Sequence, residues 1–122
     1  MSKFINYSLA ECKEIFDKVS MKDYIYTKIR EYHPDGKIKR EYTTKYGKTD
    51  GDYKEWFSNG QLATEATYVN GRLNGEYREW YPNGQLEIET TYVNNKLNGK
   101  YRSFFYDGKR NIQRTYKDDI EI

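Results

Sequence analysis

Glutamates recur at a fixed interval along the chain, and paired carboxylates are a common means of acid–base catalysis. Two columns with a spacing of 24 residues contain Glu31, Glu55 and Glu79, and Glu41, Glu65 and Glu89. Catalysis by such a pair needs a cleft that raises the pKa of one carboxyl group. We expect the members of a column to lie two strands apart, on the order of 10 Å, and in contact with water. A ladder of equal carboxylates is not a single catalytic constellation, so an enzyme is not expected.

The chain has one histidine and one cysteine, the side chains most often used as metal ligands or nucleophiles. His33 occupies the same repeat position as Phe57, Tyr81 and Phe105, which predicts a packing residue beside a turn. A zinc site would need further histidine or cysteine ligands that the sequence lacks. Cys12 has no histidine or aspartate partner near it in sequence, and both a buried thiol and a nucleophile remain open. We expect neither a metal site nor a cofactor.

A column of cations precedes a column of large aromatic rings by two residues. The cations are Arg30, Lys54, Arg78 and Arg102, and the rings are those of Tyr32, Trp56, Trp80 and Phe104. Residues two apart in a strand share a face, so each cation is expected to lean on the neighbouring ring. The alternative is a basic and aromatic stripe for an anionic partner, such as an acidic peptide or phospholipid headgroups. Neighbouring glutamates and a net charge of +2 make nucleic acid the least favoured partner.

These columns arise because the chain is an internal repeat. Residues 51–74 and 75–98 are identical at 15 of 24 positions, and the same pattern extends in phase to residues 27–50 and 99–122. A repeat of this length is typical of a stack of small units that bury their apolar surfaces against one another. The 122 residues therefore form one domain, with an extended surface instead of a deep pocket.

Each unit has the pattern of a β-hairpin. Aromatic-rich residues 75–81 and alternating residues 85–94 flank Pro82-Asn83-Gly84, which predicts a type I turn with glycine in the left-handed conformation. Residues 70–75 contain two Asn-Gly pairs and predict a second turn that links the units. Eight short antiparallel strands in meander order follow. The expected fold is mainly β, an elongated single-layer sheet of four stacked hairpins.

The three-residue turn sets the expected faces of the sheet. It places Trp80 opposite Leu86 and Arg78 opposite Ile88. One face would then carry Arg78, Trp80, Leu86, Ile88, Thr90 and Tyr92, and the other Tyr77, Glu79, Tyr81, Gln85, Glu87 and Glu89.

The repeated run G-x-Y-x-E-W-[FY]-x-N-G-Q-L, followed by Y-x-N-[GN]-x-L-N-G, resembles the MORN (membrane occupation and recognition nexus) repeat in its hairpin variant. The resemblance covers about residues 26–119. The last copy departs from it, since Arg110 stands where Leu62 and Leu86 stand. The resemblance implies a single-layer β architecture and a non-catalytic recognition role. Some bacterial members of the family are described as antitoxins, and other MORN proteins as membrane-associated scaffolds.

The N-terminal segment, residues 1–24, precedes the repeats, which occupy residues 25–122. Ser8 and Glu11 have the spacing of a helix capping box, and apolar residues then follow at helical spacing to Val19. The pattern predicts a helix over about residues 8–19 that caps the open end or face of the first hairpin. The alternative is that this helix docks on another protein.

The leading functional hypothesis is a non-enzymatic module that binds another protein across an aromatic sheet face, with an antitoxin as one form of it. The expected contacts are Tyr53, Trp56, Phe57, Tyr77, Trp80, Tyr81, Tyr101 and Phe104. One alternative is a peripheral membrane adaptor that uses the column of arginine and lysine. Another is a structural subunit that assembles through the last strand, residues 111–122. The first residues lack the apolar run of a secretory signal, so a cytoplasmic location is expected.

Overall fold

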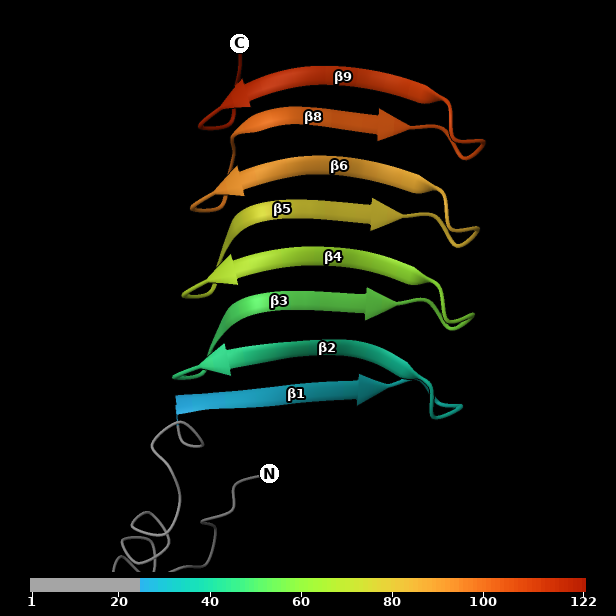
Figure 1. Cartoon of the computed structure of the whole chain (residues 1–122), viewed down its shortest axis with the longest axis vertical. Coiled ribbons are helices and arrows are strands. Elements are labelled where there is room, and N and C mark those ends of the chain that lie inside the picture. The colour runs from blue at the N-terminus through green and yellow to red at the C-terminus, as the bar shows by residue number, and fades with distance from the viewer. Residues whose placement is uncertain (1–24) are drawn as a thin grey trace, which may run out of the picture.

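The computed structural model describes residues 25–122, which form one open antiparallel sheet (Figure 1). Successive strands are neighbours, so the sheet is a meander of hairpins, as the repeat predicts. The strands are β1 (Tyr26–Tyr32), β2 (Ile38–Lys45), β3 (Lys48–Trp56), β4 (Leu62–Val69), β5 (Arg72–Trp80), β6 (Leu86–Val93), β7 (Lys96–Leu97), β8 (Gly99–Phe104), β9 (Arg110–Lys117) and β10 (Ile120–Glu121).

The eight long strands are those expected, and β7 and β10 are two-residue additions. Together β7 and β8 take the place of β5 in the preceding repeat. They are separated at Asn98, whose N–H donates to the carbonyl oxygen of Thr91. The predicted helix over residues 8–19, and its role as a cap, lie outside the described residues. Within residues 25–122 no helix is long and apolar enough to cross a membrane.

The turns along one side of the sheet are those that the proline and glycine predict. The Gly84 N–H donates to the Tyr81 carbonyl at 2.9 Å, and Gly84 has a φ of 90°. This is a type I turn followed by a left-handed glycine. The Asn83 carboxamide oxygen accepts the Gln85 N–H at 2.9 Å, which fixes the turn further. The turn type expected from the sequence is therefore confirmed.

The turns along the other side have two central residues, both with positive φ. Asn70 and Gly71 have φ values of 50° and 79°, and Asn94 and Asn95 have 49° and 69°. This is the type I′ geometry, which matches the right-handed twist of the strands that it joins. Asparagine accepts this backbone conformation more readily than most residues, which explains how Asn95 can replace glycine.

One expectation about register was wrong. Trp80 lies opposite Leu86, as predicted, but Arg78 lies opposite Glu89 and not opposite Ile88. The register shifts between Glu79 and Trp80, because β6 carries one residue more than β5 over this stretch. A shift of one residue exchanges the faces of a strand. Glu89 therefore shares a face with Arg78.

The same shift moves three predicted members of the arginine face to the tyrosine side. Ile88 pairs with Glu79, Thr90 pairs with Tyr77, and the ring of Tyr92 lies against that of Tyr77. The last copy keeps this register despite its departure at Arg110, since Gly99 pairs with Tyr116 as Gly75 pairs with Tyr92.

The sheet has no core between two layers within the described part of the chain. Of residues 25–122, only Ala66, Thr90 and Thr44 are buried, and no large side chain is fully buried. Most side chains in the middle of the sheet are half-buried, covered by neighbours on adjacent strands. Cross-strand pairs and turns must therefore supply much of the stability.

Candidate functional site

One face of the sheet carries a continuous row of alternating charges, which we call the charged face. Eight side chains, one from each long strand, lie directly opposite one another in order along the stack. They are Arg30, Glu41, Lys54, Glu65, Arg78, Glu89, Arg102 and Gln113. The two columns that the sequence suggested separately therefore form a single ladder.

The members of this ladder are joined by ion pairs. Arg78 Nε lies 2.9 Å from Glu89 and its Nη1 lies 3.4 Å from Glu65, while Arg102 Nη1 lies 3.0 Å from Glu89. Arg30 Nε lies 2.8 Å from Glu41, whose pKa is lowered chiefly by that hydrogen bond. The cations are thus neutralised by carboxylates of the same sheet.

The prediction that each cation contacts the aromatic ring two residues later in the same strand was wrong. Among residues 25–122, the cation–π contact is between Lys45 and the ring of Tyr26, at 5.7 Å. Arg78 turns instead to its cross-strand glutamates, and the hydrogen bond to Glu89 is the main cause of its raised pKa. Charge-assisted bonds to carboxylates are stronger than an exposed contact with a ring.

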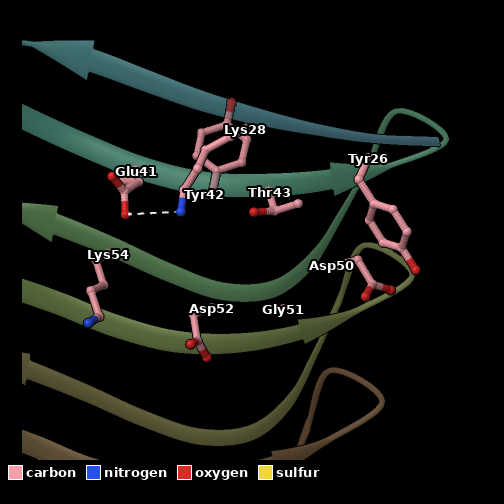
Figure 2. A pocket seen from close by; sticks show the side chains of 9 residues that line it. All are labelled: Tyr26, Lys28, Glu41, Tyr42, Thr43, Asp50, Gly51, Asp52 and Lys54. Carbon is pink, nitrogen blue, oxygen red and sulfur yellow. Dashed lines mark ion pairs between the residues drawn. The ribbon is translucent and has the colours of Figure 1, made fainter. Parts of the chain in front are cut away.

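Two hollows on the charged face repeat with a spacing of 48 residues. The first, of about 250 Å³, contains Lys28 and Glu41, which lie 3.7 Å apart (Figure 2). The second, of about 210 Å³, contains the equivalent residues Glu76 and Glu89. Both lie over a column of threonines and hold charges of both signs. No group of three or more histidine, cysteine, aspartate or glutamate side chains within residues 25–122 could hold a metal ion.

The opposite face is dominated by tyrosine, and we call it the tyrosine face. Cross-strand rows and ring contacts define its tyrosines, with ring centroids 5.4–6.1 Å apart: Tyr42, Tyr53, Tyr68, Tyr77, Tyr92, Tyr101 and Tyr116. Ala66 and Thr90, the most buried residues, lie between the tyrosines of successive units. Tyr68 and Tyr92 lie opposite Gly51 and Gly75.

Two hydroxyl groups of this face, those of Tyr53 and Tyr77, are bonded to glutamates on the same strand. Tyr77 Oη donates to Glu79 Oε1 at 2.9 Å, and Tyr53 Oη donates to Glu55. Burial, together with these bonds, raises the pKa of both tyrosines above the usual value. The hydroxyls therefore keep their protons at neutral pH and remain donors.

A second row on the tyrosine face contains an arginine between two glutamates. Glu31, Arg40 and Glu55 lie directly opposite one another on β1, β2 and β3. Arg40 Nη1 lies 3.0 Å from Glu31 and Arg40 Nε lies 3.1 Å from Glu55. The row continues to Thr64 and Glu79, again in direct opposition. We call this line of five residues the acidic row.

The sequence did not point to Arg40 and Thr64. Both occupy one repeat position, together with Ile88 and Ile112, and neither the residue type nor the charge is constant in that column. A signal was nevertheless present, because Arg40 is the only cation in an otherwise uncharged column.

The predicted contact residues fall in three places. Tyr53, Tyr77 and Tyr101 lie together on the tyrosine face. The rings of Trp56, Trp80 and Phe104 end β3, β5 and β8, and by strand alternation they continue the side of Lys54, Arg78 and Arg102.

The remaining predicted contacts, Phe57 and Tyr81, lie in the turns. Tyr81 Oη donates to the Phe104 carbonyl at 2.9 Å, and its ring lies 5.2 Å from that of Tyr106. His33 lies at the equivalent turn, with Nε2 2.9 Å from the Trp56 carbonyl oxygen. These turn residues therefore link one repeat to the next.

A comparison with curated proteins found no similar sequence. The family comparison matched the MORN repeat variant at four consecutive places, residues 28–46, 49–70, 73–94 and 97–118. Repeats of this family are non-catalytic modules that generally mediate interaction with proteins or membranes. The match follows the hairpins seen in the sheet and spans most of the chain, so this protein belongs to the MORN repeat variant family.

Proposed function

We propose that this chain is a non-catalytic module that binds another protein on its tyrosine face. The observation that supports it is a row of neutral, half-buried tyrosines with no second layer over it within residues 25–122. Tyrosine combines a large apolar surface with a polar tip, and it is enriched where proteins bind one another. Tyr53, Tyr77 and Tyr101 are the proposed contacts.

The charged face favours a protein as the binding partner over a membrane surface. An adaptor for anionic lipids needs cations that are available to headgroups. Here Arg30, Arg78 and Arg102 each have a carboxylate within 3.0 Å. Vesicles of anionic phospholipid are therefore expected to retain little of the chain, even at low salt, in a flotation assay.

Site-specific photo-cross-linking tests the proposed function. Ser103 lies on the tyrosine face, opposite Ile88, and Glu76 lies on the charged face with its side chain 70% exposed. A photoreactive benzoylphenylalanine is placed at one or other position in the full chain, expressed in its native cells. We expect a discrete protein adduct from position 103 and none from position 76. Adducts from position 76 alone, or from neither position, would refute the proposal.

A narrower form of the proposal is antitoxin-like neutralisation, in which binding across the broad face blocks a harmful protein. The extended surface suits such a role, since it can cover much of a partner. Co-expression with the product of the adjacent reading frame tests this form: growth should be rescued by the wild-type chain. Rescue should fail when Tyr53, Tyr77 and Tyr101 are replaced by serine in a variant that still folds.

A further inference from the structure

We propose that the partner inserts an arginine side chain beside Glu79 on the tyrosine face, between Thr64 and Tyr77. This inference rests on the proposed function and specifies the chemistry of the bound protein. It is drawn from a comparison of two successive repeats within the acidic row.

The first repeat shows the arrangement with its arginine in place. Arg40 bridges Glu31 and Glu55, at 3.0 Å and 3.1 Å, and the Tyr53 hydroxyl donates to Glu55. Arg40 is flanked on its two neighbouring strands by these carboxylates. Two carboxylates and a tyrosine thus surround one guanidinium.

The next repeat has the same surroundings with the arginine replaced. Thr64 stands 24 residues after Arg40 and lies directly opposite both Glu55 and Glu79. The Tyr77 hydroxyl donates to Glu79 at 2.9 Å, as the Tyr53 hydroxyl donates to Glu55. The short threonine side chain leaves room over the position that the arginine side chain fills in the preceding repeat.

The carboxylate of Glu79 has no cation of its own in the described part of the chain. Glu55 is paired with Arg40, but no lysine or arginine nitrogen within residues 25–122 lies within 4.0 Å of Glu79. Tyr77 donates to one oxygen of Glu79, and that leaves acceptor capacity for a second donor. A partly buried carboxylate gains most from a partner that brings both charge and hydrogen bonds.

Guanidinium fits this place better than ammonium. Its planar fork can donate to a carboxylate while its face stacks on an aromatic ring, and it is less strongly hydrated than ammonium. The ring of Tyr77, whose hydroxyl donates to Glu79, lies 5.4 Å from the ring of Tyr92. The residue that fills the corresponding place in the first repeat, Arg40, is also an arginine. Residues 1–24 contain lysine but no arginine, so the guanidinium must come from elsewhere.

The arrangement occurs once along the sheet. In the next repeat Ile88 takes the position of Thr64, and Ser103 takes the position of Glu79. The sheet of residues 25–122 therefore offers one arginine site, near the middle of the stack, instead of a row of equal sites.

Binding of a short peptide to the full chain tests this inference directly. The probe is acetyl-Gly-Ser-Arg-Ser-Gly-amide, titrated into isotopically labelled protein and followed by amide chemical shifts. Matched peptides carry citrulline or lysine in place of arginine. We expect weak, saturable shifts centred on Thr64, Tyr77 and Glu79 with the arginine peptide, at least threefold weaker binding with lysine, and no saturation with citrulline. Shifts of equal size with citrulline, or none with arginine, would overturn the inference.

Three variants test whether the arginine peptide binds at Glu79. Glu79→Gln should abolish the titration, and Thr64→Arg should abolish it because the new side chain fills the site as Arg40 fills its own. Glu76→Gln removes a carboxylate from the charged face and should leave the titration unchanged. The dispersion of the amide spectrum shows in each case that the sheet is folded. A titration that survives in folded Thr64→Arg would also refute the proposal.

The cross-linking experiment separates this inference from the proposed function. If the adduct from position 103 is lost in Glu79→Gln and in Thr64→Arg, both proposals stand. If the adduct persists in both variants, the chain binds a protein on this face but not through an arginine at Glu79. If the chain that carries benzoylphenylalanine at position 103 and no other substitution gives no adduct, the proposed function itself fails.

Discussion

Removal of the Glu89 carboxylate tests whether the alternating charges stabilise the sheet. Glu89 accepts from Arg78 at 2.9 Å and from Arg102 at 3.0 Å, and its side chain is 29% exposed. An exposed ion pair contributes about 0.2–1 kcal/mol, and a cross-strand pair of opposite charges contributes a similar amount. Glu89→Gln breaks two such pairs at once. Two such pairs together contribute about 0.4–2 kcal/mol, and because the Glu89 side chain is only 29% exposed we expect the free energy of unfolding to fall by an amount in the upper part of that range, about 1–2 kcal/mol.

Glu76→Gln is the matched control on the same face. Glu76 also pairs with Arg78, at 3.1 Å, but its side chain is 70% exposed and Arg78 keeps its other carboxylates. The expected loss is less than about 0.5 kcal/mol. Urea titration followed by far-UV circular dichroism measures both variants. In about 1 M NaCl, where the screening length is about 3 Å, the difference between them should shrink.

A charge swap distinguishes a ladder from a set of independent pairs. Arg78→Glu together with Glu89→Arg keeps opposite charges at these two positions. It also places a carboxylate opposite Glu65 and a guanidinium opposite Arg102. Like charges directly opposite destabilise a sheet, so the double variant should be no more stable than Glu89→Gln. Wild-type stability in the double variant, or a loss in Glu89→Gln no larger than in Glu76→Gln, would refute the reasoning.

Three further predictions concern the backbone, the tyrosines and the sheet edge. Gly75→Ala should lower the free energy of unfolding, measured by urea titration, by about 1 kcal/mol more than Gly51→Ala does. A Cβ at position 75 would lie 3.1 Å from the side chain of Thr67, whereas a Cβ at position 51 would have no atom within 4 Å. Because the pKa of Tyr77 is raised from 10.0, its contribution to stability is complete below pH 10 and is lost as pH rises towards the folded value. Stability should therefore fall above pH 10, and fall less in Tyr77→Phe; an equal fall would contradict the assignment. The wild-type chain should sediment as a monomer, whereas Gln113→Glu with Arg114→Thr should self-associate; a monomeric double variant would contradict the edge argument below.

Much of the fold could be predicted because its signals are local. The Asn-Gly or Asp-Gly pair of each unit, preceded by proline in two of the four, specifies a type I turn, and residues that tolerate positive φ specify the turns between units. Such turns need only the residues within them, so they survive changes elsewhere. The same holds for the meander, since short turns bring consecutive strands together as neighbours.

The faces could not be predicted from the turn alone. A turn fixes the first pair, Trp80 with Leu86, but the extra residue in β6 comes after that pair and reverses the rest of the strand. A different signal was available in the charges. The predicted register put Arg78 opposite an isoleucine, whereas a shift of one residue puts it opposite Glu89, and the same shift pairs Arg30 with Glu41. Electrostatic pairing across strands would have identified the register that the turn left open.

The candidate arginine site depends on that register as well. Thr64 lies opposite Glu55 because of the extra residue in β4, and opposite Glu79 because β5 carries two extra residues between Leu73 and Tyr77. In the sequence Thr64 is 9 positions from Glu55 and 15 from Glu79, and it belongs to a different repeat column from the two glutamates. Their association is a property of the paired strands and not of the repeat read along the chain.

The end of the stack shows why a face, and not an edge, is proposed to bind. At β9 three columns change together: Gln113 replaces the glutamate of the ladder, Arg110 replaces a leucine, and Arg114 stands where Ala66 and Thr90 are buried. A further strand would need an anion for its cation, an apolar partner for its aromatic ring and a small residue opposite its tyrosine. Strand β9 supplies none of these. The Arg114 guanidinium, half-exposed and 2.8 Å from Glu121, places a charge on the edge strand where a small residue would be needed, which hinders pairing with another sheet. Because the repeat ends in residues that discourage its continuation, the tyrosine face remains the surface best suited to a partner.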